Sequence, residues 1–207
     1  MNPRKFVLLA ILALCLPIAA LADSGVDFTN DGGTLTGSDA GLSLSGSTLV
    51  SVNGLNGGGL ITGTNLGEVA FATGALVSGT LKMGGTFASG GTFTITGNGS
   101  NGIPNGTIFN GSFAGPVTLT LVTLANGTHN YTLTGTLTGT LGNVSADGVA
   151  IELTINTGKG FFDSWTLISS GDTEIQSAPA VPEPGTLSLL GTGLLAVAGG
   201  LRRKINH

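Results

Sequence analysis

The fold is decided by an alternating stretch in the second half of the chain, YTLTGTLTGTL at residues 131–141. Every second position is apolar or glycine, and every position between them is threonine. A period of two is that of a β-strand with one buried face. The stretch therefore predicts a strand whose inner face carries Tyr131, Leu133, Leu137 and Leu141 and whose outer face carries Thr132, Thr134, Thr136, Thr138 and Thr140.

The same alternation continues outward from this stretch in both directions. Upstream, Phe93 and Ile95 alternate with threonines, and downstream an apolar residue stands at every second position of residues 149–155. No segment between residues 23 and 177 has a 3.6-residue apolar period, so we expect an all-β, antiparallel domain. Four dipeptides are predicted to form its hairpin turns, namely Asn98-Gly99, Asn105-Gly106, Asn126-Gly127 and Asp147-Gly148.

The composition agrees with this class and narrows the architecture. The chain has 37 glycines and only 9% charged residues, which is typical of short strands and tight turns rather than of charged, disordered chains. We expect an antiparallel β-sandwich, which we favour, or an open barrel of about 8–12 strands. A solenoid would need a fixed repeat, and we find only short echoes such as GGTF at residues 84–87 and 90–93. A third arrangement is a loosely ordered, glycine-rich segment at residues 24–67 beside a more regular second half.

Charge separates the body of the chain from its two ends. Between Asp23 and Ala180 the only basic residues are Lys82 and Lys159, against ten acidic residues. An acidic body repels nucleic acid and anionic lipid, so we expect no nucleic-acid partner.

The first 22 residues have the three parts of a secretory signal peptide. Arg4 and Lys5 precede an apolar run at residues 6–16, and Ala20 and Ala22 form a small-x-small pattern before Asp23. We expect signal peptidase to cleave after Ala22. The mature protein then has no cysteine, because the only one lies in the apolar run.

The C-terminus carries an apolar run that is bounded by charges. Residues 185–201 contain no charged side chain and, as a helix, span about 26 Å, slightly less than the hydrocarbon core of a bilayer. We expect this run to be a transmembrane helix. Arg202, Arg203 and Lys204 then act as a membrane stop and place residues 202–207 in the cytoplasm.

Val181, Pro182, Glu183 and Pro184 stand directly before that run. The tetrapeptide, the apolar run and the three cations, in this order, resemble the PEP-CTERM sorting tail of Gram-negative bacteria. The resemblance implies recognition by exosortase, a membrane-embedded cysteine transpeptidase or protease, with cleavage near Pro-Glu-Pro. It also implies an inner-membrane-anchored precursor, then delivery to the cell surface or extracellular matrix in species that make exopolysaccharide and biofilm. The two prolines keep the segment extended and free of helix, as a protease substrate requires.

Residues 23–177 therefore form the extracellular domain, and residues 178–184 a linker that contains the motif. No catalytic, cofactor or metal site is predicted in the domain. His129 is its only histidine and is expected to be an exposed polar residue near a turn. Glu68 and Glu152 are the glutamates in strand-like segments, but no pattern brings them together. A calcium site formed by Asp27, Asn30 and Asp31 is a weaker alternative, since the oxygen-rich loop of an EF-hand is missing.

These observations favour a non-enzymatic exported protein that is processed by exosortase and is structural or adhesive in exopolysaccharide. The alternative is a polysaccharide-binding or polysaccharide-active domain. The low aromatic content, with a single tryptophan and a single tyrosine, argues against a sugar-stacking surface.

Overall fold

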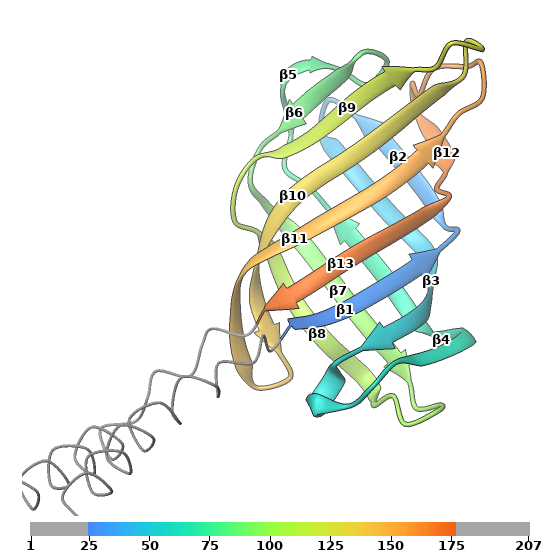
Figure 1. Ribbon diagram of the computed structural model, residues 1–207. Helices are drawn as coiled ribbons and strands as arrows, with labels where there is room; N and C mark the ends of the chain where they lie inside the picture. The colour runs from blue at the N-terminus through green and yellow to red at the C-terminus, as the bar shows by residue number, and fades with distance from the viewer. Residues whose placement is uncertain (1–24, 177–207) are drawn as a thin grey trace, which may run out of the picture.

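The computed structural model describes residues 25–176, which form one antiparallel sheet of thirteen strands (Figure 1). A short 3-10 turn, η2 (Leu55–Gly57), lies between the third and fourth strands. The strands are β1 (Gly25–Asp31), β2 (Thr34–Ser38), β3 (Gly41–Asn53), β4 (Ile61–Ala72), β5 (Leu76–Thr80), β6 (Gly84–Phe87), β7 (Gly90–Asn98), β8 (Asn105–Phe113), β9 (Val117–Thr123), β10 (His129–Leu141), β11 (Val144–Asn156), β12 (Trp165–Leu167) and β13 (Ser170–Gln176).

The sheet closes on itself through β10, the strand that contains the alternating stretch. On one side, β10 pairs with β9 through residues 129–134 and with β8 through residues 137–141; on the other side it pairs with β11 along its length. From β11 the order runs through β13, β1, β3, β4, β7 and β8 back to β10. The described residues therefore form a closed barrel of eight strands, with the other five strands as extensions.

The inner face of the barrel is filled by apolar side chains, many of them aromatic. Phe71 stacks on Phe93 with ring centroids 5.9 Å apart, and the Phe113 ring meets Phe71 edge-on at 5.7 Å. Burial of each such side chain stabilises the fold by about 2–3 kcal/mol. An eight-stranded barrel is just wide enough for side chains to fill it, so this core occupies the interior.

Glycines on the inner face of β10 make room for two of these rings. A Cβ added at Gly139 would lie 2.9 Å from Cζ of Phe109, and one at Gly135 would lie 3.1 Å from Cδ1 of Phe113. The glycines that interrupt the apolar side of the alternating stretch are therefore positions where β8 places a phenylalanine. The ring supplies the buried surface that the glycine lacks.

The predicted all-β, antiparallel class is confirmed, and so are the predicted inner faces where the side chains are described. The buried residues include Phe93, Ile95, Tyr131, Leu133, Leu137, Leu153 and Ile155. The architecture differs from the favoured sandwich and from the open barrel, because one sheet closes instead of two sheets packing. Closure follows from the two edges of β10, which pairs with β8 through residues 137–141 on one edge and with β11 on the other. Residues 25–67 form β1, β2, β3 and the start of β4, contrary to the loosely ordered alternative.

Two of the four predicted turns are wrong. Asn105-Gly106 begins β8 and pairs with residues 97–98, and Asp147-Gly148 lies inside β11 at a register shift opposite Leu137 and Thr138. The β10–β11 turn is instead formed by Gly142 and Asn143, because Leu141 pairs with Val144. A glycine with a positive φ suits a bulge as well as a hairpin turn, so the dipeptide alone does not distinguish the two. Asn98-Gly99 and Asn126-Gly127 do lie at chain reversals, after β7 and between β9 and β10.

Candidate functional site

The chain enters and leaves the barrel at one end. Gly25 of β1 pairs directly with Gln176 of β13, so the segments before and after the described residues begin side by side (Figure 1). We call this end the terminal pole; the β5–β6 hairpin and the β9–β10 turn lie at the opposite, distal pole. Whatever is attached to the two ends is therefore attached to the same pole of the domain.

A row of outward-facing side chains crosses five neighbouring strands. The register pairs Trp165 of β12 with Thr36 of β2 and Thr36 with Ser43 of β3. Ser43 pairs in turn with Ala72 of β4, and Ala72 with Thr92 of β7. We call these five residues the Trp165 row. Trp165 is 64% exposed, although tryptophan is usually largely buried.

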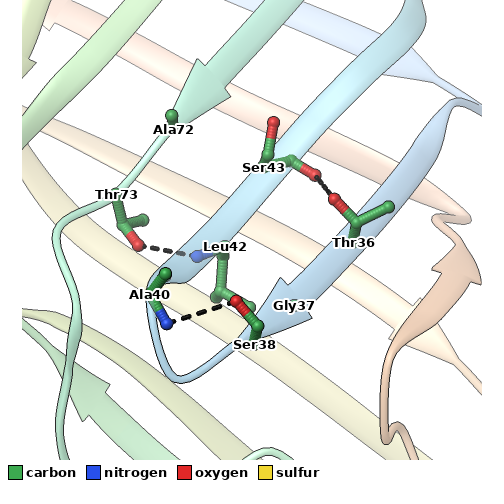
Figure 2. Close-up of a pocket in the computed structure, with 9 residues that line it drawn as sticks. Thr36, Gly37, Ser38, Ala40, Leu42, Ser43, Ala72 and Thr73 are labelled. Carbon is green, nitrogen blue, oxygen red and sulfur yellow. Dashed lines mark hydrogen bonds between the residues drawn. The ribbon is translucent and has the colours of Figure 1, made fainter.

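A surface hollow of about 350 Å³ lies along the middle of the Trp165 row. Figure 2 shows Thr36, Ser43 and Ala72 at the hollow, together with the β2–β3 turn. The Thr36 hydroxyl donates to the Ser43 carbonyl oxygen at 3.3 Å. The hydroxyl of Thr73 accepts from the Leu42 amide at 3.0 Å and so ties the end of β4 to β3. The hollow is lined by hydroxyl residues, by glycine and alanine and by Leu42, and none of its lining residues is charged.

The predicted sorting residues lie outside the described residues: Val181, Pro182, Glu183 and Pro184 of the motif, Arg202, Arg203 and Lys204 of the membrane stop, and Ala20, Ala22 and Asp23 of the cleavage site. A comparison with protein families nevertheless covers the tail. The model of the PEP-CTERM protein-sorting motif matches residues 180–204. The chain carries a PEP-CTERM sorting motif. Comparisons with curated proteins and with solved structures found no match.

The PEP-CTERM motif implies an exported protein that is made as a membrane-anchored precursor and processed by exosortase on its way to the cell surface. The motif begins four residues after the end of β13 at Gln176. The terminal pole is thus the end of the barrel from which the PEP-CTERM tail departs. Among residues 25–176 no helix is long and apolar enough to cross a membrane.

His129 does not lie where we expected it. Its side chain is buried rather than exposed, and its ring stacks on that of Phe161 with centroids 4.1 Å apart and an interplanar angle of 24°. Nδ1 lies 3.1 Å from the Gly160 carbonyl oxygen. The segment that connects β11 to β12 covers the start of β10, and no sequence pattern near His129 predicts that packing. The histidine therefore holds this connection in place.

Tyr131 holds the same connection from inside. Its hydroxyl donates to the Lys82 carbonyl oxygen at 2.7 Å and accepts from the Phe162 amide at 3.1 Å. Burial raises the pKa of Tyr131 above its ordinary value, and the hydrogen bond from Phe162 offsets part of that rise. The hydroxyl thus joins the β5–β6 hairpin to the β11–β12 connection at the distal pole.

The two glutamates considered from the sequence, Glu68 and Glu152, do not form a catalytic carboxylate pair. In the order of the sheet, β3, β1 and β13 separate Glu68 on β4 from Glu152 on β11. In the closed barrel β4 and β11 are four strands apart in either direction, and both glutamates are exposed on the outer face, so the barrel lies between their carboxylates and they do not form a glycosidase pair. The Glu68 carboxylate accepts a hydrogen bond from the Gly46 amide at 3.0 Å, where the register between β3 and β4 shifts.

The alternation of β1 separates the three candidate calcium ligands. Asn30 is fully buried, and its Nδ2 donates to the Ser47 hydroxyl at 2.7 Å, whereas Asp27 and Asp31 are exposed on the outer face. Residues on opposite faces of one strand cannot coordinate one ion. On the outer face Asp27 pairs with another carboxylate, Glu174, whereas Asp31 pairs with Ser170.

The sequence analysis missed the Trp165 row. The only sequence signal for this row is the alternation Trp165-Thr166-Leu167. The same alternation is typical of a strand whose apolar side chains face inward. Both side chains are more than 60% exposed, so the apolar positions of this strand face outward.

Proposed function

We propose that this protein is a non-enzymatic, structural or adhesive component of the cell surface or exopolysaccharide matrix. The observation that carries the proposal is the PEP-CTERM motif at residues 180–204, which follows directly from the pole where the domain begins and ends. A domain attached at one pole presents its distal pole and its sides to the surroundings. This arrangement suits a protein that is displayed and then released or transferred as a unit.

The domain itself supports a structural role. Its interior is filled by a core of aliphatic and aromatic side chains, which suits a stable scaffold. His129 and Tyr131, two side chains that often serve in catalysis, are both used to hold the β11–β12 connection. Glu68 and Glu152 stand on separated strands. We therefore assign the domain a binding or mechanical role rather than a reaction.

The delivery part of the proposal is tested in cells that contain exosortase. We expect the intact chain to accumulate at the cell surface or in the matrix, and we expect a chain lacking residues 181–207 to be lost from the surface and the matrix. Replacing Pro182 and Pro184 with alanine should reproduce the loss. The matched control is Pro179→Ala, which changes a proline just before the motif. Unchanged surface delivery of the truncated chain would refute the proposal.

The non-enzymatic part is tested separately by incubation of the purified protein with exopolysaccharide from the producing cells. We expect no release of reducing ends. Release that persists after repurification, and that is lost in Glu152→Gln or Glu68→Gln, would establish the polysaccharide-active alternative instead.

A further inference from the structure

The Trp165 row combines an exposed aromatic side chain with a series of hydroxyl side chains. At one end is a large exposed aromatic face, and Leu167, 62% exposed, stands beside it on the same face of β12. Next to it are the hydroxyls of Thr36 and Ser43, and beyond Ala72 that of Thr92. Trp165 is not itself a lining residue of the hollow; it stands next to it because its register partner Thr36 lines it.

The exposed tryptophan adds little to the stability of the domain. Apolar surface stabilises a fold only when it is removed from water, and most of the Trp165 side chain is not. A tryptophan so exposed offers a broad flat face and an indole N–H donor to a partner. Its pairing with Thr36 fixes its backbone beside the hollow.

The chemistry of the row matches that of a sugar chain. One face of a pyranose ring carries C–H groups that pack against an aromatic ring, while its hydroxyls exchange hydrogen bonds with other hydroxyls and with backbone groups. Neighbouring strands are about 4.8 Å apart, close to the advance of one ring along an extended glycan. Hydroxyls on successive strands are therefore placed to contact successive sugars. The Ser43 hydroxyl makes no hydrogen bond within residues 25–176, so it is available for this role.

Charge selects among the possible polymers. No residue of the row is charged, and the nearest charged side chain along the chain is Asp163, two residues before Trp165, whose carboxylate lies 3.9 Å from Nζ of Lys82. The domain as a whole is acidic, so it repels nucleic acids and uronic-acid polymers but not neutral glycans.

We propose that the Trp165 row is a binding site for a neutral polysaccharide, with Trp165 stacked on a sugar ring and Thr36 and Ser43 bonded to the sugars that lie along the hollow. This inference rests on the proposed function, since it names the matrix component that the protein holds. The row crosses the strands on the outer face, beside the β2–β3 turn and the end of β4, so a glycan can lie across it while the terminal pole remains attached to the tail.

The test uses the full-length chain in mild detergent and exploits its single tryptophan. Because Trp165 is the only tryptophan, emission excited where tyrosine does not absorb reports on this site alone. The neutral probes are cellohexaose and laminarihexaose, and the charged probe is a galacturonate hexamer. We expect at least one neutral probe to quench or blue-shift the emission in a saturable way, and we expect the galacturonate to leave it unchanged.

Variants assign the binding to the row. Calorimetry should give Trp165→Ala an affinity lower by about tenfold or more, and Ser43→Gln, which fills the hollow but keeps the tryptophan, should abolish the fluorescence change. The matched control is Leu60→Ala, which removes a side chain of similar exposure (67%) from the β3–β4 connection and should leave the affinity unchanged. Unchanged circular dichroism shows that each variant is folded.

Three results would overturn the inference: no response to either neutral probe, an unchanged affinity in Trp165→Ala, or a preference for the galacturonate. None of them affects the delivery test, whose outcome depends on residues 181–207. Failure of this site is therefore distinguishable from failure of the proposed function.

Discussion

Replacement of Tyr131 with phenylalanine removes a single hydroxyl that joins two parts of the distal pole. That hydroxyl donates to the Lys82 carbonyl oxygen and accepts from the Phe162 amide, at 2.7 Å and 3.1 Å. Two hydrogen bonds contribute about 1 kcal/mol each, and the Phe162 amide is left without a partner beside a side chain that is 1% exposed. We expect the free energy of unfolding to fall by about 2–3 kcal/mol. For a domain of this size that corresponds to a decrease in Tm of about 6–9 °C.

The assay is thermal and urea unfolding of the two proteins, followed by circular dichroism at neutral pH. Thr132→Val is the matched control, because it removes a hydroxyl from the next residue of β10 on the outer face. We expect the control to change Tm by less than about 2 °C, since surface substitutions usually have small effects. Equal Tm values for Tyr131→Phe and the parent would show that the hydroxyl does not hold the pole together.

The same tyrosine makes stability depend on alkaline pH. Because burial raises the pKa of Tyr131 in the folded state, the folded chain keeps its phenolic proton at pH values where the unfolded chain loses it. The contribution is complete below the unfolded value of about 10 and is lost as pH rises through the folded value. We expect the stability of the parent to fall above about pH 10 more steeply than that of Tyr131→Phe. Identical slopes for the two proteins would contradict this origin of the pH dependence.

Two further substitutions test the packing of β10 and the charges of the outer face. Gly139→Ala should lower the free energy of unfolding in urea by at least about 2 kcal/mol, because the added Cβ would meet the Phe109 ring and the Asn110 carbonyl oxygen. Gly59→Ala is the control and should be nearly neutral, because a Cβ added there has no atom within 4 Å. Glu152→Gln should raise the denaturation midpoint slightly at low salt and not in 1 M salt, because Glu152 pairs directly with Asp172 and like charges facing each other across strands repel. A midpoint that is unchanged or lower at low salt would mean that the two carboxylates do not repel.

The inner faces of the long strands could be predicted because they depend only on the chain itself. Tyr131, Leu133 and Leu137 alternate with threonines, and a strand places alternate side chains on opposite faces whatever it pairs with. The turn at Asn126-Gly127 was predicted for the same local reason. The turn predicted at Asn105-Gly106 is wrong because these two residues begin β8, and where β8 begins depends on its pairing with β7.

The packing of individual polar residues could not be predicted in this way. His129 was expected to be exposed, since a lone histidine beside an Asn-Gly turn has no local partner. It is buried because the β11–β12 connection, some thirty residues later, brings Phe161 onto its ring. The candidate site has the same origin: Trp165 and Thr36 are far apart in the sequence, and only the β2–β12 pairing makes them neighbours.

The sequence by itself determined the β class, the inner faces of the long strands and the PEP-CTERM sorting motif, because each of these depends only on residues that are close together along the chain. The tertiary structure alone decided that the sheet closes, that both ends leave from one pole, and that an exposed tryptophan stands beside a hydroxyl-lined hollow. Those features arise from pairing between strands that are distant in the sequence. Which strands pair is decided by how the whole set of apolar faces can be buried together, and no single segment carries that information.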